Sequence, residues 1–314
     1  MSTRHDIEAA SERLRGWVRR TPVEEAPTLG PNVWLKCENL QVTGSFKVRG
    51  ATNAILTLPD ETRSRGVVTA SSGNHGLGVA RAASKIGVPA TVFVPNDGYD
   101  ETTEAISRMN VPIERVGDDC VHTEQYARLI ATKSDRTYLH PYNDPAIIAG
   151  QGTIGVELME QLPSLDAVFI AMGGGGLISG VGAYLKAVAP NVEVVGCSPA
   201  ASPAMHRCLE AGAIIDVPCR ATLSGATAGG IEPGAITFDI CREVVDRTVL
   251  VGEAHIAAAM RHIIGTHHML IEGAAGVAVA GYQQLASEYQ NKTVAIVLCG
   301  ANVSTTQLRK ILAG

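Results

Sequence analysis

The stretch ENLQVTGSFKVRGA, residues 38–51, places a lone lysine, Lys47, between two glycines and directly after an aromatic residue, Phe46. No acidic residue stands beside Lys47, so the local sequence offers its ammonium group no ion-pair partner. Burial lowers the pKa of a lysine, and the free amine can then form a Schiff base with an aldehyde and act as a base. Most lysines are simply exposed, so three further segments must decide between these interpretations.

Composition restricts the class of protein. The chain has 314 residues, enough for two domains or one large one, and its 46% hydrophobic and 18% charged residues are typical of a globular protein. Aromatic residues make up only 4% and the net charge is -5, which argues against a nucleic-acid surface. Glutamates lie on both sides of the arginines between Arg13 and Arg20, so we expect a solvated helix face there.

The cysteines and the apolar segments of the sequence indicate where in the cell the protein is found. The seven cysteines are odd in number and contain no C-x-x-C pair, which argues against a disulfide framework and a structural zinc site. The first 20 residues are charged and lack the apolar core of a signal peptide. No apolar segment is long enough to span a membrane. We therefore expect a cytoplasmic protein with no membrane contact.

Short β-branched runs alternate with alanine-rich helical stretches, which predicts an α/β fold with largely parallel sheets covered on both faces. The expected strands are residues 33–37, 66–70, 90–94, 113–116, 167–171, 192–196 and 293–298. The expected helices are residues 78–86, 102–109, 123–132, 153–161, 177–188 and 255–266.

Proline-containing breaks divide this pattern. Pro141 and Pro145 interrupt it on one side, and Pro59 interrupts it on the other. We expect a large domain of residues 1–57 and 144–314 with a small inserted domain of residues 66–143. A ligand would then lie in the cleft between them, at the carboxyl ends of the strands.

The second segment, SSGNHG at residues 71–76, follows an expected strand and precedes an expected helix. Backbone amides and small hydroxyls at a helix N-terminus form a ready anion site, and a substrate carboxylate suits it. An ordinary turn with a serine cap is the simpler alternative. The density of Ser, Gly, Asn and His favours the functional interpretation.

Four consecutive glycines, Gly173, Gly174, Gly175 and Gly176, form the third segment between an expected strand and helix. Glycine lets the backbone approach a bound group closely, so this loop predicts a phosphate site at a helix N-terminus. The fourth segment is Cys299-Gly300-Ala301-Asn302, after the last expected strand. Free cysteine is usually a small core residue, but this position also suits a contact in the cleft.

One further motif is interpreted as structural. Residues 150–155, GQGTIG, match the G-x-G-x-x-G pattern of dinucleotide-binding proteins. They follow an Ala/Ile stretch that is more typical of a helix than of a strand, and no suitable acidic residue follows at the distance that the motif requires. We predict a helix that packs closely through its glycines.

Taken together, the four segments resemble the fold-type II pyridoxal-phosphate enzymes, in the branch of the serine/threonine dehydratases and serine racemase. The resemblance extends from Thr21 to Asn302, and TGSFKVRGA at residues 43–51 is its most specific match. It implies a fold similar to that of the tryptophan synthase β chain, with a doubly wound large domain and a smaller inserted α/β domain.

The resemblance also implies the site. Lys47 would hold pyridoxal 5'-phosphate as a Schiff base, Phe46 would lie against its ring, and Asn74 would hydrogen-bond its ring hydroxyl. Cys299 would face the pyridine nitrogen, where relatives often carry serine. The phosphate would lie on Gly173, Gly174, Gly175 and Gly176, and the substrate carboxylate on Ser71, Ser72, Gly73, Asn74 and His75.

The implied reaction is the α,β-elimination of a 3-hydroxy amino acid, such as L-threonine or L-serine, to a 2-oxo acid and ammonia. Ser72 would lie across the cofactor from Lys47, where a serine can reprotonate the opposite face, so an amino-acid racemase with side dehydratase activity stays open. Tyr142, in place of the usual phenylalanine, and the unusual residues 223–233 leave phenylserine or 3-hydroxyaspartate open as substrates.

Two other functions are disfavoured. Intact Lys47 and Asn74 argue against a non-catalytic metabolite-binding protein, and His75 argues against a β-replacement synthase, because those enzymes usually carry threonine there.

The resemblance also bears on metal binding and assembly. Relatives that bind a divalent cation carry acidic residues where Ser198 and Ala204 stand, so we expect no metal at that site. A homodimer is expected from the resemblance and from the prevalence of two-fold symmetry.

Overall fold

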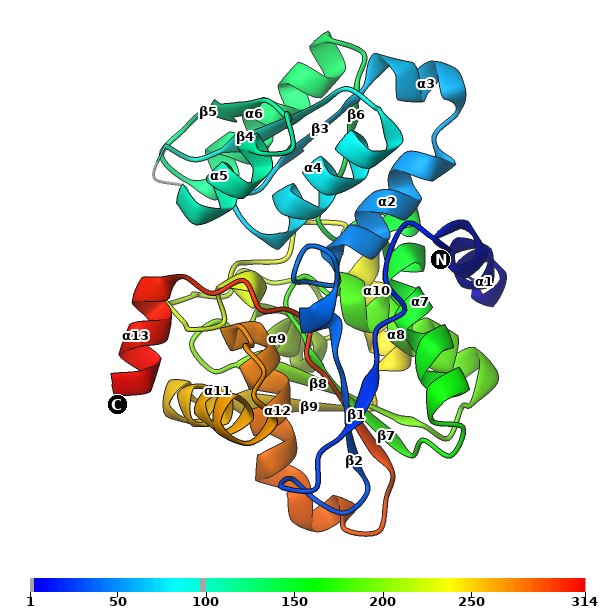
Figure 1. Cartoon of the computed structure of the whole chain (residues 1–314), viewed down its shortest axis with the longest axis vertical. Coiled ribbons are helices and arrows are strands. Elements are labelled where there is room, and N and C mark those ends of the chain that lie inside the picture. Colours follow the sequence, from blue (N-terminus) through cyan, green and yellow to red (C-terminus); the bar gives the residue numbers. More distant parts are fainter. Residues whose placement is uncertain (1–2, 97–99, 314) are drawn as a thin grey trace.

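Two β-sheets organise the chain in the computed structural model, which describes residues 3–96 and 100–313 (Figure 1). The larger sheet contains β1 (Val23–Glu25), β2 (Val33–Lys36), β7 (Ala167–Ala171), β8 (Glu193–Pro199), β9 (Arg247–Val251) and β10 (Val294–Val297). Its order is β1-β2-β10-β7-β8-β9, and only the pairing of β1 with β2 is antiparallel. Strand β7, with the sequence AVFIA, is buried along its whole length, as expected for a sheet covered on both faces.

The smaller sheet is formed by one continuous part of the chain. It contains β3 (Val67–Ala70), β4 (Ala90–Val94), β5 (Ile113–Arg115) and β6 (Thr137–Tyr138), in the order β5-β4-β3-β6 with every pairing parallel. Because strands on both sides of this part in the sequence belong to the larger sheet, we propose residues 66–143 as the inserted domain.

Helices cover both sheets (Figure 1). Those around the smaller sheet are α3 (Asp60–Arg65), α4 (Asn74–Ile86), α5 (Asp100–Ser107) and α6 (Cys120–Lys133). The others are α1 (Arg4–Arg13), α2 (Lys47–Thr57), α7 (Pro145–Gln161), α8 (Gly176–Val188), α9 (Ala204–Ala211), α10 (Ile236–Val244), α11 (Glu253–His267), α12 (Gly273–Leu285) and α13 (Thr305–Ala313). Short 3-10 turns lie at Glu38–Leu40, Gly225–Thr227 and Ala286–Tyr289.

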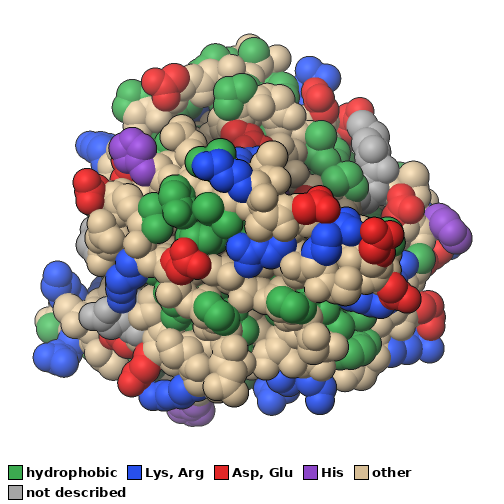
Figure 2. Space-filling view, turned by 90° about the horizontal axis from the view of Figure 1, so that it is seen from above, with side chains coloured by type: hydrophobic (Ala, Val, Ile, Leu, Met, Phe, Trp, Pro, Cys, Tyr) green, Lys and Arg blue, Asp and Glu red, His purple; other side chains and the backbone are tan. Residues whose placement is uncertain are grey.

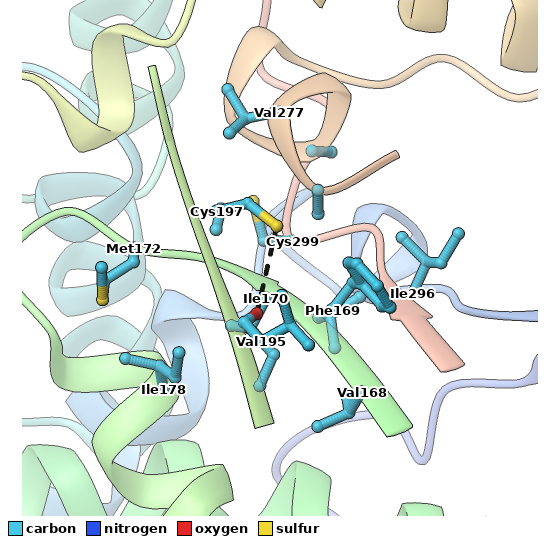
Figure 3. Close-up of a cluster of buried hydrophobic side chains, with 14 of the residues drawn as sticks. Val168, Phe169, Ile170, Met172, Ile178, Val195, Cys197, Val277, Ile296 and Cys299 are labelled. Carbon is cyan, nitrogen blue, oxygen red and sulfur yellow. Dashed lines mark hydrogen bonds between the residues drawn. The ribbon is translucent and has the colours of Figure 1, made fainter. Parts of the chain in front are cut away.

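The main core lies on the larger sheet (Figure 3). Ile170, Val195 and Ile296 from neighbouring strands are fully buried together with Val277 from α12. The ring of Phe169 packs edge-on against Tyr282 and Tyr289, with centroids 5.3 and 5.1 Å away. This dense packing fixes the strand ends from which the glycine loop and the segment of Cys299 begin.

All of the expected strands are present, and so are all of the expected helices, with shifted ends. Strands β1, β6 and β9 were missed. The first two are short and only partly apolar, and β9 is only partly buried. The N-terminal arginines Arg15, Arg19 and Arg20 are exposed, as predicted, but the prediction that they share a helix face was wrong. Helix α1 ends at Arg13, and Gly16 follows with a φ of 78°, which no helix can continue. Helix α2 was also missed, so Lys47 opens a helix rather than lying in a loop.

The glycine-rich motif at residues 150–155 lies inside α7, as predicted. A Cβ atom added to Gly150 would lie 2.6 Å from Cα of Gly50 in α2, and one added to Gly152 would lie 2.9 Å from the carbonyl oxygen of Gly180 in α8. Neighbouring helices therefore approach α7 backbone to backbone. The motif is a packing surface in this protein.

This contact predicts the effect of one substitution on stability. Gly150→Ala should lower the free energy of unfolding by about 2–3 kcal/mol, since α2 and α7 must separate to admit a methyl group. Chemical denaturation would measure the loss. Gly265→Ala in α11 is the matched control, because its added Cβ meets no atom within 4 Å, and it should be neutral or slightly stabilising. Equal effects of the two substitutions would contradict the packing interpretation.

The surface carries charges of both signs. Figure 2 shows Lys and Arg side chains interspersed with Asp and Glu on the face seen from above. Within the described part of the chain, no helix has the length and apolar character that crossing a bilayer requires.

Candidate active site

Lys47 is the first residue of α2, and its side chain points to a backbone carbonyl. Its Nζ donates a hydrogen bond to the oxygen of Pro141 at 2.6 Å. The residue keeps some exposed surface, but its ammonium group lies among protein atoms, and this desolvation lowers the pKa of Lys47 to about 8. The nearby Cys299 and Glu272 oppose this shift only in part. The amine is thus closer to its reactive, neutral form than an ordinary lysine.

The segment after β10 lies beside the lysine segment. The backbone N–H of Phe46 donates to the oxygen of Cys299 at 3.1 Å, and Ser45 forms an antiparallel bridge with Gly300. The ring centroid of Phe46 lies 5.3 Å from Nζ of Lys47. Two segments that are some 250 residues apart in sequence therefore bring the lysine, an aromatic ring and a thiol together. Burial raises the pKa of the Cys299 thiol well above its usual value.

Glu272 is a site residue that the sequence analysis missed. It precedes α12 and is 4% exposed, and both of its carboxylate oxygens accept hydrogen bonds from Nδ2 of Asn74 at 2.9 Å. The N–H of Asn302 donates to Glu272 at 3.2 Å, and the Asn302 amide donates to Oδ1 of Asn74 at 2.6 Å. Burial raises the pKa of Glu272 to about 7, so this carboxyl changes protonation near neutrality. A lone acid directly before the run GAAGVAVAG was the available signal.

The turn at residues 71–76 connects β3 to α4. Gly73 N–H donates to Oγ of Ser71 at 3.2 Å, and α4 begins at Asn74. The ring of His75 is already engaged, because Nε2 donates to the oxygen of Leu139 at 3.0 Å. Burial lowers the pKa of His75 to about 3, so the ring stays neutral. The groups that this turn, including Ser72, offers to an anion are therefore hydroxyls and the N–H groups of the first turn of α4.

The four glycines connect β7 to α8, a helix of 13 residues that begins at Gly176. Gly175 has a φ of 87°, a conformation that favours glycine. A Cβ atom on Gly174 would lie 2.6 Å from Cγ of Tyr142, and one on Gly173 would lie 2.7 Å from Cα of Thr227. The loop is thus a cradle that only glycine fits, at the positive end of a helix dipole, which suits a phosphate group.

Direct contacts join Lys47 to the glycine loop and to α4. Pro141, which accepts the hydrogen bond from Lys47, is followed by Tyr142, whose ring covers Gly174. On the other side, a Cβ atom on Gly78 of α4 would lie 3.1 Å from the backbone carbon of Lys47. An amine, an aromatic ring, a turn with N–H groups that suit an anion and a glycine loop that suits a phosphate are thus joined through direct contacts. These residues fit pyridoxal phosphate.

Possible metal ligands occur beside this site. Among the described residues, Glu124, His140 and Glu232 have ligand atoms within 4.8 Å of one another. Arg128 occupies both carboxylates, at 2.7 and 2.9 Å, and Nδ1 of His140 accepts two backbone N–H groups, which places the ring proton on Nε2. A metal-bound histidine instead donates from its second nitrogen. We interpret the group as an ion-pair cluster that links α6 to the loop before α10.

At the position where the sequence led us to expect no metal, the hydroxyl of Ser198 donates to the oxygen of Met172 at 2.8 Å, and Ala204 begins α9.

Comparison with known proteins gives consistent matches. Residues 14–300 match the family model described as pyridoxal-phosphate dependent enzyme. The chain is 39% identical to an L-threonine ammonia-lyase of Thermotoga maritima, over 99% of this chain and 78% of the relative. It is 35% identical to an L-threo-3-hydroxyaspartate ammonia-lyase of a Pseudomonas species, over 100% of this chain and 99% of the relative.

Solved structures agree with these matches. The structure of maize serine racemase superposes with a TM-score of 0.93 at 29% identity, covering 99% of this chain and 97% of the other. The match includes both sheets and the helices that carry the site. The chain therefore belongs to the fold-type II family of pyridoxal-phosphate-dependent enzymes, and its homologues include threonine ammonia-lyases and serine racemases.

Proposed function

We propose that this protein removes the β-hydroxyl group of a 3-hydroxy amino acid, such as L-threonine or L-serine, and releases a 2-oxo acid and ammonia. The observation that carries the proposal is the amine of Lys47, whose pKa is lowered to about 8, beside an anion-binding turn and a glycine cradle. Pyridoxal phosphate, when bound, supplies an electron sink for the α-carbon of the substrate.

Each residue has a role in this proposal. Lys47 would hold the cofactor through Nζ and, once displaced by the substrate amine, would take the proton from the α-carbon. The turn at residues 71–75 would orient the substrate carboxylate, so that this proton points to Lys47. The glycines at 173–176 would hold the phosphate, and Phe46 would lie against the ring.

Asn74 and Cys299 would set the electronic state of the cofactor. The NH2 group of Asn74, which donates to both oxygens of Glu272, would also donate to the ring hydroxyl, while Asn302 holds the amide oxygen. Burial raises the pKa of Cys299 well above its usual value, so this residue stays a neutral thiol and would place no charge at the pyridine nitrogen of a bound cofactor. A neutral partner there limits charge delocalisation into the ring, which favours prompt elimination over a long-lived carbanion.

Two observations keep the alternatives open. Ser72 lies in the anion-binding turn, where its hydroxyl would be the proton donor of a racemase, and the similarity to maize serine racemase supports this. Tyr142 covers the glycine loop, and its hydroxyl accepts a hydrogen bond from the N–H of Glu232 at 3.2 Å. Tyr142 therefore also holds the loop of residues 223–233, whose sequence differs from that of the usual dehydratases. The similarity to a 3-hydroxyaspartate ammonia-lyase supports an acidic substrate.

The experiment that tests the proposal is a substrate panel on cofactor-loaded protein. L- and D-serine, both threonines, the 3-hydroxyaspartates and the phenylserines would be assayed for 2-oxo acid and for the opposite enantiomer. Oxo acid from one substrate supports the dehydratase and identifies that substrate. Enantiomer without oxo acid supports the racemase and assigns Ser72 a proton-transfer role. No turnover of any substrate would contradict the proposal.

The lowered pKa of Lys47 predicts its reactivity. In cofactor-free protein, labelling of Lys47 by formaldehyde and borohydride should rise with pH and reach half of its maximum near pH 8, because the neutral amine is the reactive form. Peptide mass spectrometry would follow the labelled fraction. The same peptide in urea-unfolded protein is the control, and its labelling should continue to rise toward about pH 10.4. Parallel curves would contradict the desolvation of this amine.

The homodimer and the cytoplasmic location expected from the sequence stay predictions. Light scattering of the purified protein would test the first, since a dimer has twice the mass of the 32.9 kDa chain.

A further inference from the structure

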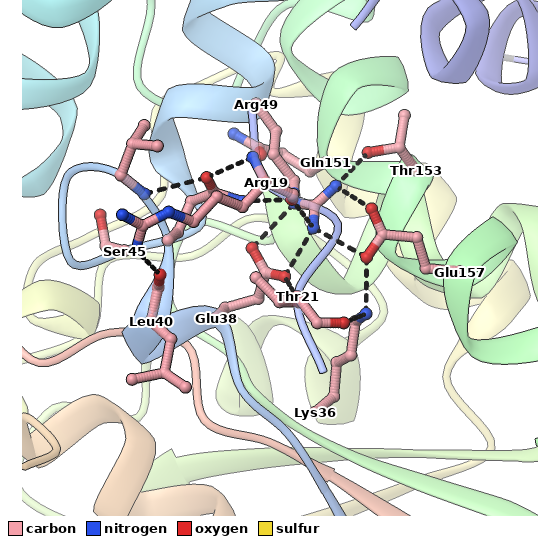
Figure 4. A network of polar contacts seen from close by, with 12 residues as sticks. Arg19, Thr21, Lys36, Glu38, Leu40, Ser45, Arg49, Gln151, Thr153 and Glu157 are labelled. Atoms are coloured by element: carbon pink, nitrogen blue, oxygen red, sulfur yellow. Dashed lines mark hydrogen bonds and ion pairs between the residues drawn. The ribbon is translucent and has the colours of Figure 1, made fainter. Parts of the chain in front are cut away.

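Four charged side chains are buried together below the helix that begins with Lys47 (Figure 4). Lys36 and Glu38 are 0% exposed, Arg49 is 1% exposed and Glu157 is 8% exposed. The two cations and two carboxylates balance in charge. We call them the buried charge cluster.

Arg49 is the centre of the buried charge cluster. Its Nε and Nη2 donate to the two oxygens of Glu38 at 2.8 and 2.7 Å, and Nη1 and Nη2 donate to the two oxygens of Glu157 at 2.6 and 2.9 Å. Nη1 also donates to Thr153 and Nη2 to the oxygen of Arg19, each at 3.2 Å. The guanidinium plane is therefore fixed by two bidentate pairs, a geometry that no other side chain provides.

Lys36 holds the far side of the cluster. Its Nζ donates to Glu157 at 2.5 Å, to Gln161 at 2.8 Å and to the oxygen of Thr21 at 2.8 Å, which uses all three donors of an ammonium group. Buried ion pairs are weak evidence for stability, because well-packed apolar residues often stabilise a core as well or better. A cluster so completely satisfied calls for another explanation, and its place in the chain provides one.

Glu38 and Arg49 mark the two ends of the lysine segment. Between them, the backbone is hydrogen-bonded at several points to the segment after β10: Asn39 N–H to the oxygen of Leu298 at 2.8 Å, Phe46 N–H to that of Cys299 at 3.1 Å, and Ala301 N–H to that of Gly44 at 2.8 Å. Lys47 lies one residue after the last of these contacts on its own segment and two residues before Arg49. The ion pair thus closes the segment on which the orientation of Lys47 depends.

We propose that the Arg49–Glu38 ion pair is a positioning pair for Lys47, which aims Nζ by fixing the first turn of α2. Neither residue touches the reacting atoms, and both act through the backbone of the lysine segment. The inference rests on the proposed function, because it assigns to Lys47 the role of the active amine.

The test compares Arg49→Lys with Lys36→Met, both in cofactor-loaded protein. Arg49→Lys keeps the charge but loses the bidentate geometry, so kcat should fall about 10- to 100-fold while KM changes less than about three-fold. The circular dichroism of the bound cofactor should also weaken, since this signal reports how the cofactor is held. Lys36→Met should lower the melting temperature by about as much as Arg49→Lys does. It should leave kcat and the dichroism of the cofactor within about two-fold of the wild-type values.

Glu38→Gln is the milder second variant, in case Arg49→Lys fails to fold, and it should reproduce the loss of kcat and of dichroism. If the Arg49 or Glu38 variant matches Lys36→Met in both readouts, the pair only stabilises the fold and the inference is overturned. Borohydride reduction of the wild-type protein separates this outcome from a failure of the proposed function. Cofactor trapped on Lys47 supports that function even if the positioning pair is rejected, and cofactor trapped elsewhere rejects both.

Discussion

Replacing Lys47 with alanine is expected to lower kcat by about 10³- to 10⁴-fold with every substrate that the wild-type protein turns over. The substitution removes both the amine that would hold the cofactor and the base that would take the α-proton. Helix α2 should survive the change, because alanine is the best helix former and Lys47 occupies an end position. The loss should therefore appear in turnover and not in the far-ultraviolet circular dichroism.

Steady-state kinetics would measure the loss, and borohydride reduction followed by peptide mass spectrometry would show whether the cofactor still attaches to the chain. Lys133→Ala is the control, since Lys133 is an exposed lysine at the end of α6. It should retain wild-type kcat. Full activity of Lys47→Ala would show that another residue supplies the amine, and the proposed mechanism would then be wrong.

Gly174→Ala is expected to weaken the binding of pyridoxal phosphate by about 100-fold, or roughly 3 kcal/mol. The added methyl group would lie 2.6 Å from Cγ of Tyr142, so either the ring or the loop must move. Since Tyr142 follows Pro141, which holds Lys47, a shift of the ring would disturb both the cradle and the amine. Titration of cofactor-free protein with pyridoxal phosphate, followed by absorbance, would measure the affinity.

A second substitution separates steric clash from a general loss of stability. Gly174→Ala combined with Tyr142→Ala removes the ring that the methyl group would strike, and it should recover part of the affinity. Gly265→Ala, far from any close contact, should bind the cofactor as the wild type does. If Gly174→Ala alone bound the cofactor normally, the glycine loop would not be the phosphate cradle.

The sequence predicted those parts of the fold that depend on local pattern. The buried parallel strands are continuous apolar runs, so β2, β4 and β7 were found within one residue of their ends. Helix α2 was missed because its first turn contains Gly50 and its capping residue Phe46 makes no side-chain cap. Position 50 carries glycine because Gly150 of α7 approaches it closely. The sequence around residue 50 gives no sign of this contact.

The roles given to the motif residues stay predictions, and the sequence analysis missed residues whose contacts are long-range. Lys47, Asn74 and the glycine loop lie in recognisable stretches. Glu272 stands alone in sequence and meets Asn74 only because the N-terminal ends of α12 and α4 come together at the site. The oxygen of Pro141 belongs to the backbone, so no residue pattern could have identified it as the partner of Lys47.

The contact of Gly78 with the backbone of Lys47 has a consequence for changing the substrate. Because a side chain at this position would have no space, the helix with the carboxylate turn and the helix with the amine meet at a fixed distance. If the proposed function holds, the distance between the carboxylate-binding turn and the amine of Lys47 is thus set by this helix contact. Substitutions that admit new substrate side chains should therefore be sought in the loop held by Tyr142, and the contact between α2 and α4 should be left unchanged.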